Sequence, residues 1–122
     1  MREAFTMGGH LIAAIGIDGK LADLDMPASA YRVLLQLRSK SEPGGRVRTD
    51  QEAIAQQLRL SRPCVNRAFK MLESARLIAK MKNGIYQVNP VLAGYGNMDD
   101  LHAAIDGAQE WQGANSLRSL NK

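Results

Sequence analysis

The feature that most constrains this chain is a pair of helix starts with a short turn between them. Thr49-Asp50-Gln51-Glu52 has the pattern of a capping box, in which the Thr49 hydroxyl accepts a backbone N–H and Glu52 reaches back to the cap. Ser61 is a second N-cap residue, and Arg62 and Pro63 suit the first turn of the helix that follows. We therefore expect a short helix that stops near Arg59-Leu60 and a second helix over about 61–75.

Apolar spacing supports the second helix and predicts another one before the pair. An i, i+3, i+4, i+7 stripe is typical of a helix with one buried face. The second helix has this stripe at Val65, Ala68, Phe69 and Leu72, and an earlier segment has it at Ala30, Val33, Leu34 and Leu37. Pro27 suits the opening turn of that earlier helix, which we expect to end near Ser41.

A β-hairpin is expected directly after the helix pair. Asn83-Gly84, the preferred pair for a type I′ turn, separates the runs Leu77–Lys82 and Ile85–Asn89. A two-residue turn would pair Lys82 with Ile85, Met81 with Tyr86, Lys80 with Gln87 and Ala79 with Val88. Leu77, Ala79, Met81, Tyr86 and Val88 would then face inward, and Lys80, Lys82 and Gln87 outward. Arg46-Val47-Arg48 is expected to be a small strand.

The remaining segments complete the predicted organisation. Residues 1–25 are expected to be a β-like segment, a strand or a strand pair that turns at Gly19. Residues 26–92 hold the helix pair and the hairpin, residues 97–112 an amphipathic helix whose apolar stripe ends at Trp111, and residues 113–122 a disordered tail. The fold class is mainly α with a small β-hairpin (α+β). Its element order is that of a winged helix-turn-helix domain with an added C-terminal helix.

Charge is distributed unevenly along the chain. Between Arg32 and Lys82 there are twelve basic residues and four acidic ones, whereas the remaining segments are acidic overall. A basic central region favours a polyanion as partner, and the second helix of a helix-turn-helix is sized for the major groove of DNA. Arg and Asn suit base edges there, and Lys suits phosphates. The expected DNA-binding residues are Arg46, Arg48, Arg59, Ser61, Arg62, Pro63, Asn66, Arg67, Lys70, Lys80, Lys82 and Asn83.

Two sets of residues resemble known families. The run from Thr49 through Leu58-Arg59-Leu60-Ser61-Arg62 to Ala75-Arg76-Leu77-Ile78 resembles winged-helix bacterial regulators of the GntR and MarR kind. The run Asn83-Gly84-Ile85-Tyr86-Gln87-Val88-Asn89-Pro90, with Gly94 beyond it, is similar to the wing of RepL-type plasmid replication proteins. The resemblance covers about 28–96 and lacks most of the N-terminal region of the RepL family. It implies sequence-specific binding of double-stranded DNA by a transcription regulator or by a plasmid replication or maintenance protein.

Other functional classes have little support in the sequence. Cys64 is the single cysteine, and His10 and His102 lie far apart in the sequence, so we expect neither a disulfide nor a metal site. No catalytic constellation is visible, and we expect no enzyme activity, no cofactor and no small-molecule ligand. No run reaches the length of a membrane span, and a cytoplasmic protein is expected.

Two questions about partners stay open at this stage. The apolar stripe ending at Trp111 and the apolar N-terminal segment favour a homodimer, although the last helix could instead pack on its own domain. The alternative function is a winged-helix protein–protein interaction module whose basic face binds an acidic protein.

Overall fold

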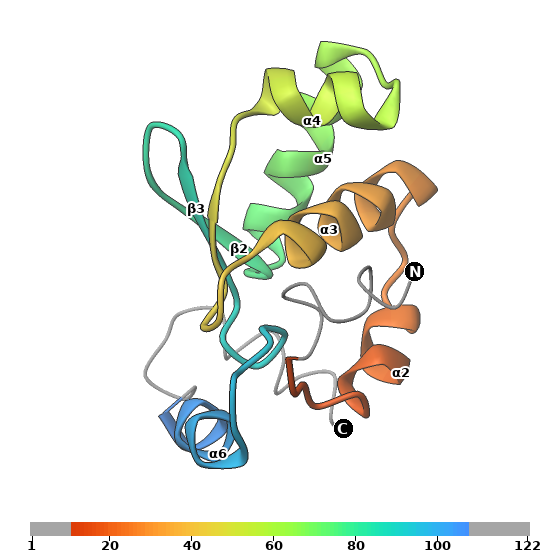
Figure 1. Cartoon of the computed structure of the whole chain (residues 1–122). Coiled ribbons are helices and arrows are strands. Elements are labelled where there is room, and N and C mark those ends of the chain that lie inside the picture. Colours follow the sequence, from red (N-terminus) through yellow and green to blue (C-terminus); the bar gives the residue numbers. More distant parts are fainter. Residues whose placement is uncertain (1–10, 108–122) are drawn as a thin grey trace, which may run out of the picture.

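The computed structural model describes residues 11–107, and Figure 1 shows their arrangement. Within this range the chain forms five helices and one three-stranded antiparallel sheet, which confirms the α+β class. The elements in chain order are α2 (Ile17–Ala22), α3 (Ala28–Lys40), β1 (Arg46–Arg48), α4 (Gln51–Leu58), α5 (Arg62–Ser74), β2 (Ile78–Lys82), β3 (Ile85–Val88) and α6 (Met98–Gly107).

Helix α4 begins where the sequence predicts, but with a different capping residue. The side chain of Asp50, not that of Thr49, accepts the N–H of Ala53 at 2.8 Å. The predicted capping box is therefore wrong by one position, because either residue has a side-chain oxygen suited to the role. Glu52 is then free of the cap and reaches the next helix. Helix α4 ends at Arg59, whose left-handed conformation (φ 58°) turns the chain sharply toward α5.

Helix α5 follows its sequence signals closely. The Ser61 hydroxyl accepts the N–H of Cys64 at 3.2 Å, and Pro63 occupies the first turn. The four predicted stripe residues are all buried, and Phe69 stacks edge-to-face on Tyr86 with ring centroids 5.0 Å apart. Helix α3 packs against both α4 and α5, so its own buried stripe forms the middle of the core.

The sheet differs from the prediction in its register, and it includes β1 as a third strand whose partner the sequence did not predict. Its strand order is β1-β3-β2, because Arg46–Arg48 pairs with the outer side of β3. Lys82 pairs with Ile85 as expected, but a bulge then shifts the register so that Lys80, not Met81, pairs with Tyr86. Met81 is consequently 59% exposed instead of facing inward.

The turn of the hairpin explains this shift. A type I′ turn needs positive φ at both central residues. Here Gly84 has φ 81°, whereas Asn83 is not among the described non-glycine residues with positive φ. The turn is therefore not type I′, and its twist does not match that of the strands. The bulge at Met81 accommodates this mismatch.

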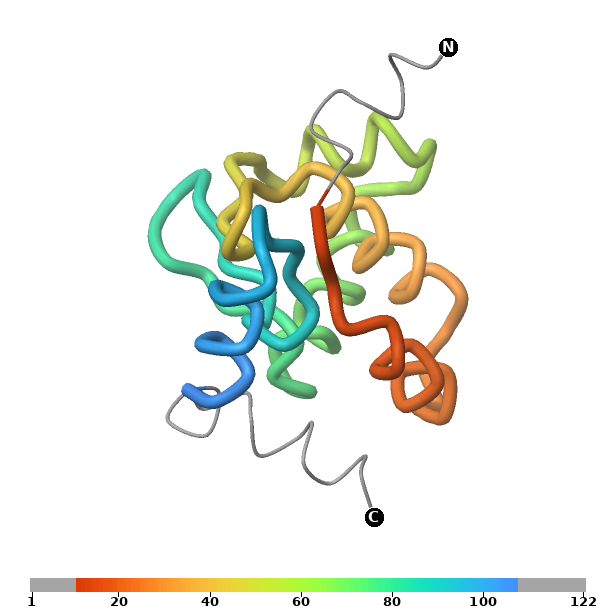
Figure 2. The backbone as a smooth tube through the Cα atoms, turned by 60° about the horizontal axis from the view of Figure 1, so that its bottom comes forward, coloured from red at the N-terminus to blue at the C-terminus, as the bar shows by residue number. Residues whose placement is uncertain are grey.

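The N-terminal expectation of a strand pair turning at Gly19 is wrong within the described residues. Ile17–Ala22 is a helix that contains Gly19, and its Ile17 and Leu21 are buried. Ile12 alone forms a β-bridge, with Tyr95, so the segment before α2 lies beside the segment after β3 (Figure 2). As a helix, this segment buries Ile17 and Leu21, which an isolated strand pair would leave partly exposed.

Helix α6 begins within the predicted range and lies at the end of the molecule away from α4 in Figure 1. Its Leu101 forms a small second cluster with Ala93 and Tyr95. The predictions for residues 1–10, for the apolar stripe from Ala108 to Trp111 and for the tail 113–122 concern residues outside the described range.

Candidate nucleic-acid interface

Helix α5 has two sharply different faces. One face is buried against α3 and α4. The other presents Arg62, Pro63, Arg67 and Lys70 as exposed side chains, with Asn66 half-buried between them. Side chains on such a face can contact base edges and phosphates when a helix lies in a DNA groove.

Arg62, in the first turn of α5, is held by helix α4. Its Nη1 donates to Oε1 of Glu52 at 2.6 Å, and both side chains are about half exposed. An ion pair this exposed contributes little to stability, on the order of 1 kcal/mol or less. Its effect is on geometry, because it fixes the direction in which the remaining guanidinium donors point.

Asn66, one turn further along α5, is held by the neighbouring residue of the same α4 turn. Its Nδ2 donates to Oε1 of Gln51 at 3.1 Å. Gln51 also hydrogen-bonds to the hydroxyl of Tyr86, which lies on β3. Asn66 is thus less exposed than the sequence predicts, and it is linked through Gln51 to the hairpin.

The ionisation of Tyr86 reflects this environment. Burial raises the pKa of the Tyr86 hydroxyl above its ordinary value of 10.0, and the charges of Glu73 and Asp50 raise it further. The hydrogen bond from Gln51 acts in the opposite direction on this pKa. The phenol is therefore neutral at physiological pH.

The hairpin and β1 place further cations around α5. Lys80 and Lys82 are exposed on β2, with Asn83 exposed at the turn. In Figure 1 the hairpin and the α4–α5 pair extend to the same side of the molecule. Arg46 and Arg48 are exposed on β1, on either side of the buried Val47, and Arg48 pairs with Glu42 at 3.4 Å.

The turn between α4 and α5 exposes Arg59 and Ser61 and is supported from behind by α3. Nη2 of Arg32 donates to the Leu58 carbonyl at 2.9 Å, at the C-terminal end of α4. Gln36, one turn later on α3, donates to the Gln57 side chain at 3.1 Å. Sequence reasoning missed Arg32, Gln51 and Glu52 as supporting residues. Their polar type gave no sign of which neighbour they would contact.

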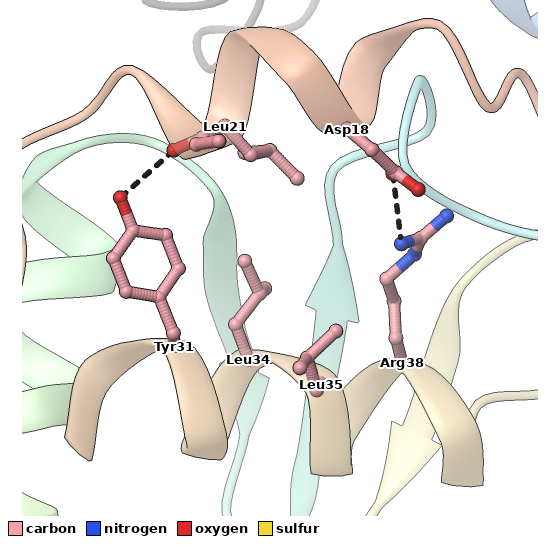
Figure 3. Close-up of a pocket in the computed structure, with 7 residues that line it drawn as sticks. Asp18, Leu21, Tyr31, Leu34, Leu35 and Arg38 are labelled. Carbon is pink, nitrogen blue, oxygen red and sulfur yellow. Dashed lines mark hydrogen bonds and ion pairs between the residues drawn. The ribbon is translucent and has the colours of Figure 1, made fainter. Parts of the chain in front are cut away.

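A separate small hollow lies between α2 and α3. It has a volume of about 230 Å³ and is lined mainly by apolar side chains, among them Leu21, Leu34 and the exposed Leu35. Figure 3 shows that Tyr31 and Arg38 close its two ends, where Tyr31 donates to the Leu21 carbonyl at 2.8 Å and Arg38 pairs with Asp18 at 3.4 Å. This hollow lies on α3 and shares no residue with the exposed face of α5.

Within residues 11–107, no group of three or more potential metal ligands occurs, and no helix is long and apolar enough to cross a membrane. Cys64 is half-buried, with its backbone N–H bound to the Ser61 hydroxyl.

Two short helices with a tight turn, a three-stranded sheet and a projecting basic hairpin together define a winged helix-turn-helix domain, a class of DNA-binding module. Residues 31–90 match the Crp-like helix-turn-helix domain family. This match begins on α3, ends two residues after β3 and covers just under half of the chain. No curated protein and no solved structure gives a significant match.

Proposed function

We propose that this protein binds double-stranded DNA in a sequence-specific manner, with α5 as the recognition helix and the β2–β3 hairpin as the wing. Arg62, Asn66 and Arg67 read bases in the major groove. Lys80 and Lys82 contact the phosphates beside it.

The two-faced character of α5 is the observation that carries this proposal. Its buried face fixes the helix on the domain, and its opposite face is polar and basic from Arg62 to Lys70. The similarity of residues 31–90 to the Crp-like helix-turn-helix domain supports the same assignment.

The proposed surface also includes exposed residues of the elements that flank or form the helix-turn-helix. These are Arg46, Arg48, Arg59, Ser61, Pro63, Lys70 and Asn83. Backbone contacts from such residues position a domain on the duplex without reading sequence. The proposed activity is binding without catalysis.

The biological role that we propose is either transcription regulation or plasmid replication and maintenance. The resemblance of residues 83–90 to the RepL wing favours the second role, and the general helix-turn-helix pattern favours the first. The position of the gene separates the two roles. A plasmid origin beside it favours replication, and a divergent promoter beside it favours regulation.

We further propose that the protein acts as a homodimer that reads two half-sites about one helical turn apart. Ile15 is 77% exposed and Leu35 is 58% exposed, and large apolar side chains of this kind favour an interface. Sedimentation velocity at tens of micromolar protein, with and without DNA, is expected to show a dimer. A monomer under both conditions contradicts this part of the proposal.

The proposal is tested by selecting bound duplexes from a random library and then measuring affinity for selected and random duplexes over a series of salt concentrations. We expect a defined base preference together with a steep loss of affinity as salt rises. An acidic protein partner is the alternative occupant of the basic face. It is favoured if no base preference is selected and if an acidic polypeptide binds as tightly as DNA does.

A further inference from the structure

The hydrogen bond between Asn66 on α5 and Gln51 on α4 has a defined donor and acceptor. Asn66 donates through Nδ2 to Oε1 of Gln51 at 3.1 Å. Oε1 is the acceptor end of the Gln51 amide, so this bond makes Nδ2 of Asn66 the donor. The Gln51 side chain also hydrogen-bonds to the Tyr86 hydroxyl on β3, which lowers the pKa of that hydroxyl.

This direction decides which groups Asn66 presents outward. One of its two N–H groups is engaged by Gln51, which leaves one N–H donor and the Oδ1 acceptor. Rotating the Asn66 amide by half a turn would place two carbonyl oxygens, Oδ1 and Oε1 of Gln51, against each other. The contact therefore excludes the flipped amide for as long as Gln51 keeps its orientation.

The free donor and acceptor of Asn66 match one base better than the others. Adenine presents the N7 acceptor and the N6 amino donor in the major groove, whereas guanine presents two acceptors, N7 and O6. A side chain offering one donor and one acceptor side by side pairs with adenine and opposes an oxygen to O6 of guanine. A reversed contact, with Gln51 donating to Oδ1, would offer two donors and favour guanine.

We propose that Gln51 is a positioning residue that makes Asn66 a reader of adenine. This inference rests on the proposed function of α5 as a recognition helix. Gln51 acts through Asn66, because its Oε1 is the acceptor that engages Nδ2. The selection that we propose arises from the direction of this hydrogen bond.

The test uses the full chain and the duplex selected from the random library. Asn66→Ala first identifies the base pair that Asn66 contacts, as the position where base preference falls. Adenine is expected there. Replacing that adenine by 7-deazaadenine, which lacks the N7 acceptor, should weaken binding of the wild-type protein about ten-fold and leave binding by Asn66→Ala unchanged.

Gln51→Ala should reduce the adenine preference at the same base pair about ten-fold, with little change in affinity for random duplex. It should have no further effect in the Asn66→Ala background, because it acts through Asn66. Gln51→Glu keeps an acceptor toward Nδ2 and should retain the adenine preference, while the added negative charge weakens binding of all duplexes alike.

Several results would overturn the inference while leaving the proposed function intact. These are guanine at the Asn66 position, an undiminished adenine preference in Gln51→Ala, and an equal loss from Gln51→Ala with or without Asn66. A wild-type protein that binds selected and random duplexes equally would instead refute the proposed function, and the inference with it. Circular dichroism of each variant verifies that the helices remain folded.

Discussion

Asn89 links the start of the β2–β3 hairpin to its end, and its replacement should destabilise the whole domain. It follows β3, is 0% exposed and is the one buried polar residue in the described range. Its Nδ2 donates to the carbonyl of Arg76 at 3.1 Å, and its Oδ1 accepts the N–H of Val91 at 3.0 Å. Arg76 lies in the connection that leads from α5 into β2, so the amide bridges both ends of the hairpin.

Asn89→Ala removes both hydrogen bonds and leaves a space too enclosed for easy solvation. Depriving a buried polar group of its partner costs about 1–3 kcal/mol. The cost for the N–H of Val91 is at the low end of this range, because Val91 is only half-buried. We therefore expect a loss of roughly 2–4 kcal/mol in the free energy of unfolding, a large share of the ~5–15 kcal/mol typical of a domain. The melting temperature should fall by roughly 10–20 °C.

Asn97→Ala is a matched control. Asn97 also accepts one hydrogen bond, from the N–H of Asp100 at 2.8 Å, and donates one, to the Asp100 carboxylate at 3.2 Å, but it is exposed. Losing it should cost about 1 kcal/mol, as for an N-cap residue. Urea unfolding of both variants measures the difference. Equal losses would show that burial of the Asn89 hydrogen bonds does not matter and would refute the reasoning.

Three further predictions concern binding, backbone geometry and pH. Arg67→Ala should cost about 1–3 kcal/mol on the selected duplex and much less on random DNA, whereas Lys80→Ala should weaken binding of both alike and reduce the salt slope by roughly one; the opposite pattern in titrations over salt would reverse their roles. Gly45→Ala should destabilise the protein more than Gly84→Ala, although both glycines have positive φ (100° and 81°). An added Cβ at Gly45 would lie 2.8 Å from the backbone oxygen of Val88, whereas at Gly84 it would meet nothing within 4 Å; equal melting temperatures would contradict this. The raised pKa of Tyr86 contributes stability that is fully present below its unfolded value of 10.0 and is lost as pH rises through the folded value, so that Tyr86→Phe should show a smaller alkaline loss in unfolding measurements between about pH 9 and 12.

The sequence by itself determined α3, α4 and α5 and the basic, exposed face of α5. Ser61 and the apolar spacing after it fix α5, because a cap and a stripe act within a few residues of each other. The same local rules place the exposed arginines and lysines around α5, since residues opposite a buried stripe must face solvent. Local signals also placed the hairpin at Asn83-Gly84 and predicted its inward-facing Tyr86 and Val88.

Only the tertiary structure decided the contacts between elements. The pairing of β1 with β3, the bulge that exposes Met81 and the helical form of Ile17–Ala22 depend on neighbours distant in sequence. The same is true of the contact from Gln51 to Asn66, since a glutamine can donate or accept and only the surrounding fold decides which. Side-chain periodicity specifies which face of an element is buried, but it does not specify what that face meets or in which direction a hydrogen bond runs.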